Sequence, residues 1–168
     1  MRTGFLAALG VVLLLATDLL LATDNAHAAA PERQTSLPVT SVVIDSSRGP
    51  IRFTAEVAAD PASQERGLMF RTKLAPNAGM LFDFHTPAFQ TFWMKNTILP
   101  LDMIFIRADG TISSIAAEAT PYSETPIPSY EPVRAVLEIN GGRAATLGIE
   151  RGQRVHNAIF GNALPGQK

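Results

Sequence analysis

Apolar and polar residues alternate with a period of two over much of the chain after residue 38, which is the pattern of half-buried β-strands. Residues 39–45 are rich in β-branched side chains, residues 46–50 carry turn chemistry and residues 51–57 alternate, so this stretch predicts a β-hairpin. Asp109-Gly110 predicts a second tight hairpin. Strands are predicted over 79–84, 89–94, 101–106, 112–118, 133–139 and 153–160.

Two short helices are predicted between these strands. Asp60-Pro61 supplies a carboxylate at the N-cap position and proline at the first helical position, which predicts a helix to about Phe70. Asn140 is expected to cap a second helix, which ends near Leu147 with Gly148 as its left-handed stop.

Residues 120–132 contain four prolines, and because proline cannot donate to a strand ladder this segment predicts a long surface loop. Seven or eight short strands with two short helices predict a mainly β fold, either a β-sandwich or a distorted barrel, largely antiparallel.

The first 28 residues have the pattern of a secretory signal peptide. Arg2 precedes an almost wholly apolar run, and Ala26-His27-Ala28 offers small residues two apart at a cleavage site. Asp18 interrupts the apolar run, which leaves it shorter than the roughly 20 residues of a spanning helix. We expect cleavage before Ala29 and a periplasmic or secreted protein with no stable membrane anchor. The alternative is an uncleaved anchor.

The rest of the chain is predicted to be one unit, because it contains no internal repeat and no second composition shift. Residues 29–38 are polar and flanked by proline, which indicates a flexible leader. We expect a single β domain over 39–162 and a C-terminal tail over 163–168.

Composition narrows the classes of partner. After residue 28 the acidic and basic residues are equal in number and form no basic cluster, so no nucleic acid is expected as a partner. The chain contains no cysteine, which excludes disulfides and thiol chemistry. It also lacks a glycine-rich phosphate loop and a HExxH motif, and only His85 and His156 remain after export. No cofactor and no metal are therefore expected.

The methionines are the one pattern that raises a metal site as an alternative. Met69, Met80, Met94 and Met103 fall within a short stretch, and thioethers are ligands that Cu(I) accepts. The favoured interpretation is packing, because Met80 and Met103 lie on predicted core faces beside phenylalanines.

Residues 92–101 form the strongest candidate site. A Lys-Asn-Thr cluster separates two apolar runs, and the chain's single tryptophan and Asp102 adjoin it. A cation, an amide, a hydroxyl and a carboxylate beside a large aromatic surface suit recognition of a small polar molecule. This interpretation places Trp93, Lys95, Asn96 and Asp102 in one cleft with Arg66 on its rim.

Strand parity puts two carboxylates among apolar neighbours. Asp102 shares a face with Ile104 and Ile106, and Glu138 shares a face with Val136. An unpaired buried charge is costly, so Lys95, Arg66 or Arg71 is expected to lie against one of these carboxylates. Such a pair either fixes strand register or belongs to the cleft, and the sequence leaves both interpretations open.

Five blocks of the chain resemble, in order, the signature blocks of the domain of unknown function 192 (DUF192) family. They are Glu65-Arg66-Gly67-Leu68-Met69-Phe70-Arg71, Gly79-Met80-Leu81-Phe82, Phe92-Trp93-Met94-Lys95-Asn96-Thr97, Pro100-Leu101-Asp102-Met103-Ile104-Phe105 and Leu137-Glu138-Ile139-Asn140-Gly141-Gly142. The resemblance covers nearly all of residues 39–160. It implies a small, mainly β, sandwich-like domain that is often exported in bacteria, and it carries no activity.

The residues of these blocks that offer polar or aromatic chemistry are the best site candidates that the resemblance implies: Arg66, Arg71, Trp93, Lys95, Asn96, Asp102 and Glu138. No catalytic role attaches to any of them.

Three hypotheses for the function follow. The first is an exported module that binds a small polar ligand, such as a saccharide, with Trp93 as a stacking surface. The second is an enzyme that uses Asp102 or Glu138 as acid or base beside Lys95, which predicts a strongly perturbed carboxylate pKa. The third is an interaction protein whose loop 120–132 docks on a protein partner, which predicts an exposed apolar patch and a poor pocket.

Overall fold

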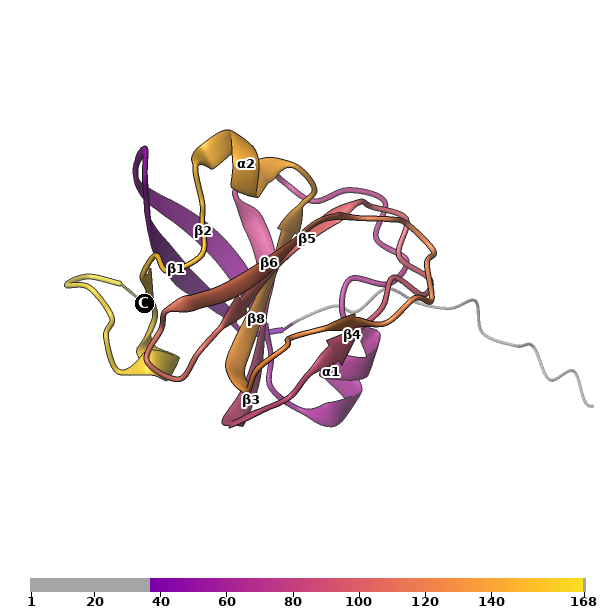
Figure 1. The fold of residues 1–168 in the computed structure, drawn as a ribbon, viewed down its shortest axis with the longest axis horizontal. Coiled ribbons are helices and arrows are strands. Elements are labelled where there is room, and N and C mark those ends of the chain that lie inside the picture. The colour runs from indigo at the N-terminus through magenta and orange to yellow at the C-terminus, as the bar shows by residue number, and fades with distance from the viewer. Residues whose placement is uncertain (1–36, 168) are drawn as a thin grey trace, which may run out of the picture. The chain divides into compact units, whose positions relative to one another are not determined.

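The computed structural model describes residues 37–167, and the predicted signal peptide and most of the predicted leader lie outside them. Within this part of the chain the fold is mainly β, as predicted (Figure 1). A seven-stranded sheet has the order β6-β5-β8-β3-β2-β1-β9, and a two-stranded sheet is formed by β4 and β7.

The strands of the large sheet are β1 (Val39–Ser46), β2 (Gly49–Ala58), β3 (Ala78–Ala88), β5 (Leu101–Ile106), β6 (Ile112–Ala119), β8 (Val133–Asn140) and β9 (Val155–His156). The small sheet contains β4 (Thr91–Phe92) and β7 (Ile127–Pro128), and the helices are α1 (Pro61–Arg66), α2 (Arg143–Leu147) and a 3-10 helix over Ala158–Phe160.

Local turn chemistry sets the two predicted hairpins. β1 and β2 pair antiparallel from Val39 opposite Glu56 to Ser46 opposite Gly49, and β5 and β6 pair antiparallel around the turn that contains Gly110. Gly110 has a φ of 84°, a conformation that glycine adopts without strain. The strand pairs around β8 are also antiparallel, whereas β2 and β3 are parallel because α1 connects them as a crossover.

Alternation along the central strands buries side chains on both faces of the sheet. One face contributes Ile104 and Leu137 to a core that α2 helps to cover through Ala144. The opposite face contributes Met103 and Phe105 to a second core. In Figure 1, α2 lies at the top beside β2, and α1 lies at the bottom beside β4 and β3. The candidate site lies on the second face.

The structure corrects the extent of helix α1 and the cap of α2. Asp60 caps α1 as predicted, since its carboxylate accepts hydrogen bonds from the Ala62 and Ser63 amides, but the helix ends at Arg66 rather than near Phe70. Gly142 occupies the N-cap of α2, so the prediction that Asn140 caps it is wrong. Asn140 lies within β8, and its side-chain amide instead donates to two carbonyls of the loop before β3.

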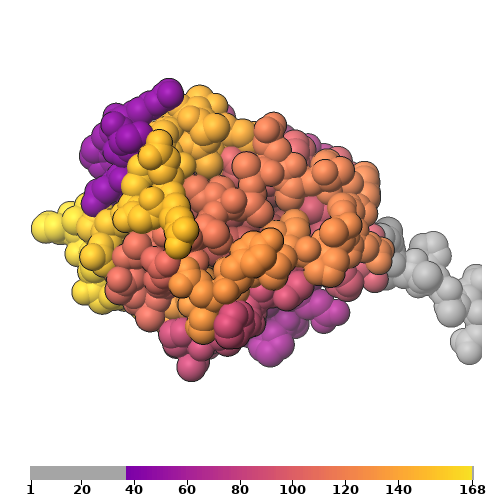
Figure 2. Space-filling model, in the orientation of Figure 1, coloured from indigo at the N-terminus to yellow at the C-terminus, as the bar shows by residue number. Residues whose placement is uncertain are grey.

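Two strand predictions and the loop prediction are also corrected. Of residues 89–94 only Thr91 and Phe92 are in a strand, and of 153–160 only Val155 and His156. The segment 120–132 lies on the surface in Figure 2, as predicted, but it contains the short strand β7, which pairs with β4. Proline is tolerated there because this two-stranded sheet leaves one edge of β7 unpaired.

Both ends of the described segment contact the domain. The Pro38 carbonyl accepts a hydrogen bond from the Val57 amide, and the Gln167 side chain donates to the carbonyls of Ser41 and His156. No helix between residues 37 and 167 has the length and apolar character needed to cross a membrane.

Candidate functional site

Glu138 is a buried acid in the middle of the sheet. It lies on β8 between Met80 of β3 and Met103 of β5, which are its register partners, and its residue surface is only 4% exposed. No residue between 37 and 167 forms a hydrogen bond or an ion pair with its carboxyl group. Burial raises its pKa to about 8, because removal from water disfavours the charged form. The side chain is therefore mostly protonated at neutral pH.

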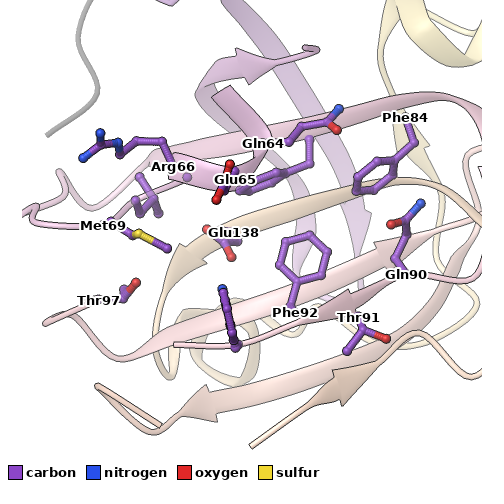
Figure 3. A pocket seen from close by; sticks show the side chains of 14 residues that line it. Gln64, Glu65, Arg66, Met69, Phe84, Gln90, Thr91, Phe92, Thr97 and Glu138 are labelled. Atoms are coloured by element: carbon purple, nitrogen blue, oxygen red, sulfur yellow. The ribbon is translucent and has the colours of Figure 1, made fainter. Parts of the chain in front are cut away.

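The carboxyl group of Glu138 reaches an open cavity of about 310 Å³, here called the inner cavity (Figure 3). Such a volume is at the lower end of the range of small-molecule sites. Helix α1 contributes the polar side chains of Gln64, Glu65 and Arg66 to its wall, the loop after α1 contributes Met69, and the segment after β4 contributes Thr97. In Figure 3, Glu138 lies between Met69 and Thr97 on one side and Phe92 on the other.

The apolar wall of the inner cavity is built around Phe92. Its ring packs edge-to-face on Phe82 at 5.1 Å between centroids, on Phe105 at 6.0 Å and on Phe84 at 6.3 Å. These edge-to-face contacts are a favoured geometry of aromatic pairs, so the wall is ordered by its own packing. The short pairing of β4 with β7 holds Phe92 over this face of the sheet.

Gly67 allows α1 to end directly against this aromatic wall. Its φ is 48°, and its amide donates to the Ser63 carbonyl to close the helix. A Cβ atom at this position would lie 3.2 Å from Cζ of Phe82, which is tighter than ordinary contact. The backbone conformation therefore favours glycine here, and a larger residue would also have to displace the Phe82 ring.

A second, outer cavity of about 490 Å³ adjoins the inner one and shares Glu65, Arg66, Met69 and Trp93 with it. Lys95 and Asn96 line only the outer cavity. The Lys95 ammonium lies 5.0 Å from the centroid of the Trp93 ring, in a cation–π contact. The structure thus brings Trp93, Lys95, Asn96 and Arg66 together around one opening.

Asn96 has a structural role in this opening. Its φ is 54°, a left-handed conformation that Asn adopts more readily than most residues, and its carbonyl accepts a hydrogen bond from the Phe70 amide. Its side-chain amide lies 3.9 Å from the Met69 sulfur. Asn96 therefore links the loop after β4 to the loop after α1.

The prediction that Asp102 lines the same cleft is wrong, because Asp102 points to the other face of the sheet. Its residue surface is fully buried, and its carboxylate accepts hydrogen bonds from the amides of Glu118 at 2.8 Å, Gly142 at 2.9 Å and Ala144 at 2.7 Å. Two of these amides belong to the start of α2. Asp102 thus caps this helix from a neighbouring strand, in the role that the sequence assigned to Asn140.

The expectation that a cation pairs with Asp102 or Glu138 is wrong for both carboxylates. Backbone amides satisfy Asp102, and Glu138 has no partner in residues 37–167. Arg71 instead forms a two-pronged ion pair with Glu56, with nitrogen–oxygen distances of 2.6 and 2.5 Å. Arg71 lines neither cavity, so it supports the loop after α1 rather than the site.

Sequence reasoning missed Glu65 and the phenylalanine wall. The signal was available for Glu65, which opens the first family-like block and lies within the predicted helix. The wall required knowledge of which strands adjoin, because Phe82 and Phe92 come from β3 and β4 and pack on each other only in the folded protein.

The methionines and histidines have structural surroundings. Met80, Met94 and Met103 are fully buried in the second core, which confirms the predicted packing of Met80 and Met103.

His156 contacts Asp45 at 2.8 Å near the sheet edge, and exposed His85 contacts the Ala59 carbonyl. Residues 37–167 contain no group of three or more His, Asp or Glu side chains arranged to hold a metal ion.

Comparison with known proteins places the chain in a family. The model of the DUF192 family, described as "Uncharacterized ACR", matches residues 42–157. The chain belongs to the DUF192 family. This confirms the family that the five sequence blocks resemble, and the match includes every residue of both cavities.

Two solved structures share the fold of this DUF192 chain. A protein from Sinorhizobium meliloti, whose name suggests a transcription regulator, is 45% identical with a TM-score of 0.72, over 75% of this chain and 98% of that one. A protein of unknown function from Novosphingobium aromaticivorans is 46% identical with a TM-score of 0.72, over 77% of this chain and 94% of that one. No curated protein matches the chain.

Proposed function

We propose that this protein binds a small ligand in the inner cavity, with Glu138 as the polar anchor and the aromatic wall as the apolar contact surface. The observation that carries this proposal is the buried carboxyl group of Glu138, which has no hydrogen-bond or ion-pair partner among residues 37–167 and lies at the base of an open cavity. Trp93, which is half exposed where the two cavities meet, supplies a flat surface at the entrance. Lys95 and Asn96 then contact the part of the ligand that reaches the outer cavity.

The energetics of Glu138 favour a binding role over an architectural one. A buried polar group without a partner lowers the stability of the fold, and an apolar residue would fill the same position on β8 without that cost. Asp102 shows what an architectural carboxylate looks like in this fold, since three amides satisfy it. The presence of an acid that destabilises the free protein is explained if a bound ligand supplies the hydrogen bonds that its carboxyl group lacks.

The proposal includes export of the protein to the periplasm or the medium, which rests on the pattern of residues 1–28. Mass spectrometry of the exported protein is expected to give a mature start at or near Ala29. A ligand met outside the cytoplasm is then a nutrient, a signalling compound or a fragment of the cell envelope. The name of the Sinorhizobium relative raises transcription control, but the balanced charge of residues 29–168 does not favour contact with DNA.

An enzyme is the second candidate, because the raised pKa of Glu138 is what a general acid or base requires. Catalysis also needs further polar groups that orient the substrate. The Gln64 amide is already hydrogen-bonded to the carbonyls of Ala58 and Asp83, and the Thr97 hydroxyl to that of Lys95. Binding is therefore better supported than catalysis.

Docking of a protein partner on the segment 120–132 is the third candidate. Tyr122 and Tyr130 are 61% and 79% exposed on this segment, which gives a partner aromatic surface to contact. The well-formed inner cavity favours a small ligand as the main function.

The test is a screen of small polar compounds, including sugars and amino acids, by thermal shift and by ligand-observed NMR. We expect at least one compound to raise the melting temperature of the wild type and to lose this effect in Glu138→Leu. Glu150→Gln is the control, since Glu150 is exposed and lines neither cavity. A blank screen, or stabilisation that survives in Glu138→Leu, contradicts the proposal.

A further inference from the structure

The groups that surround Glu138 define the charge of the ligand. Four aromatic residues, Phe82, Phe84, Phe92 and Trp93, line the inner cavity together with the carboxylate of Glu65. The Arg66 guanidinium lies 5.7 Å from the Phe70 ring, and in Figure 3 it points away from Glu138. The cavity therefore presents two acids and several aromatic rings, and Arg66, its one lining cation among residues 37–167, is directed elsewhere.

We infer that the inner cavity takes a small organic cation, an amine whose ammonium group pairs with Glu138 and whose apolar part packs on the phenylalanine wall. This inference deepens the proposed function and rests on it. Aromatic faces carry negative charge density and attract cations, and a desolvated carboxylate is satisfied best by a charged partner. An anionic ligand would instead meet the carboxylate of Glu65 and, above the raised pKa of Glu138, a second negative charge.

A neutral ligand satisfies Glu138 less completely than an ammonium group does. A protonated carboxyl group donates one hydrogen bond to a carbonyl or hydroxyl oxygen and leaves its second oxygen without a donor. An ammonium group offers three donors, so it can reach both oxygens of an ionised Glu138 and also contact Glu65. Binding of the ammonium form releases the proton of Glu138 to solvent, and no other group gains or loses a proton.

The release of a proton gives the inference a pH signature. The pKa of Glu138 is raised to about 8 in the free protein, so affinity for an amine increases with pH, by roughly tenfold per unit below that pKa. Within residues 37–167, the other charged groups that line the two cavities are Glu65 and Arg66 on α1 and Lys95 in the outer cavity. Beyond Met80 on the same face, Glu56 is paired with Arg71. Simple aliphatic amines stay protonated to about pH 10, so their own titration does not mask this trend.

The experiment compares three probes that share a phenyl ring and differ in the head group: 2-phenylethylamine, 2-phenylethanol and 3-phenylpropionate. Each is titrated into the purified protein at pH 6, 7 and 8 with NMR detection of chemical shifts. We expect the amine to bind at least tenfold more tightly than the other two at pH 8, and its affinity to fall as the pH is lowered. Glu138→Gln, which keeps the shape and removes the charge, should weaken amine binding at least tenfold, whereas Glu150→Gln should not change it.

Two results overturn the inference and are distinct from failure of the proposed function. Tighter binding of the alcohol or the carboxylate than of the amine shows that the cavity prefers another charge, while small-ligand binding stands. Equal amine affinity in wild type and Glu138→Gln shows that the ammonium does not pair with Glu138. If none of the three probes binds, the cation inference falls, and the broader screen decides separately whether the proposed function falls with it.

Discussion

Asp102 and Glu138 lie on neighbouring strands, but their side chains point to opposite faces of the same sheet. In the pairing of β5 with β8, Asp102 is opposite Ile139 and Glu138 is opposite Met103, so the two carboxylates are one register step apart. Side chains alternate between faces at each step. Asp102 consequently meets the amides of α2, whereas Glu138 meets an open cavity.

Glu138 should make the stability of the protein depend on pH. Its pKa is about 8 in the folded protein and near 4.5 when unfolded, so the folded state binds more protons between these values. The free energy of unfolding is therefore expected to fall as pH rises from 5 to 8, by at most about 1.4 kcal/mol per pH unit. Glu138→Gln and Glu138→Leu remove this dependence, and Glu138→Leu is more stable than wild type at pH 8.

Urea unfolding at pH 5, 6, 7 and 8 gives the free energy of unfolding of wild type and of both variants. The difference between wild type and each variant, followed across pH, measures the contribution of Glu138. The difference cancels contributions from other titrating groups that the variants share. Parallel stability profiles for wild type and Glu138→Leu would show that Glu138 is ionised in the folded protein, and its assignment as a neutral acid would be wrong.

Asp102 should behave in the opposite way. Asp102→Ala leaves three amides without their acceptor, one of them buried, and detaches the start of α2, so we expect a loss of roughly 3–5 kcal/mol in the free energy of unfolding. Asp102→Asn keeps one acceptor oxygen and should cost less. The check is denaturant unfolding, together with ligand titration of Asp102→Asn, whose affinity should match that of wild type. A loss below about 1 kcal/mol for Asp102→Ala would contradict the capping role.

Local patterns were enough to predict the mainly β fold, because turn residues set each hairpin on their own. The Asp60-Pro61 cap and the Asp109-Gly110 turn both appear where the sequence places them. Strand parity likewise predicted that Glu138 is buried among apolar residues. These features depend on residues that are close together in the chain.

The partners of the buried carboxylates could not be predicted, because they depend on which elements become neighbours. The amides that satisfy Asp102 come from residues 16, 40 and 42 positions away. Arg71 was a reasonable partner for Glu138 by charge. In the structure it forms its ion pair with Glu56, which lies on the same face of the sheet as Glu138 but two strands away from it. Asn96 was assigned to ligand binding from the polar cluster and the family-like block that contain it, and its left-handed backbone became visible only in the structure.

Phe105 should contribute strongly to stability, because it is buried in the second core and its ring contacts Phe92. Phe105→Ala is expected to cost roughly 3–5 kcal/mol. Phe89→Ala is the matched control, since Phe89 is 71% exposed and its removal should change stability by less than about 0.5 kcal/mol. Urea unfolding measures the loss of stability in each variant. Similar losses in the two variants would show that the buried position of Phe105 and the exposed position of Phe89 are assigned incorrectly.

Asn96 provides a test of whether the opening of the outer cavity is held by backbone conformation or by side-chain chemistry. Because its φ is 54°, Asn96→Leu places a branched side chain in a left-handed conformation and should cost roughly 1–2 kcal/mol, even though Leu is similar in size. Asn96→Gly relieves this restriction and should keep the stability within about 1 kcal/mol of wild type. Thermal unfolding of wild type and both variants checks this expected order of stability. If Asn96→Leu is as stable as wild type and Asn96→Gly is not, then the side-chain contact with Met69, rather than the backbone, positions the loop that carries Trp93 and Lys95.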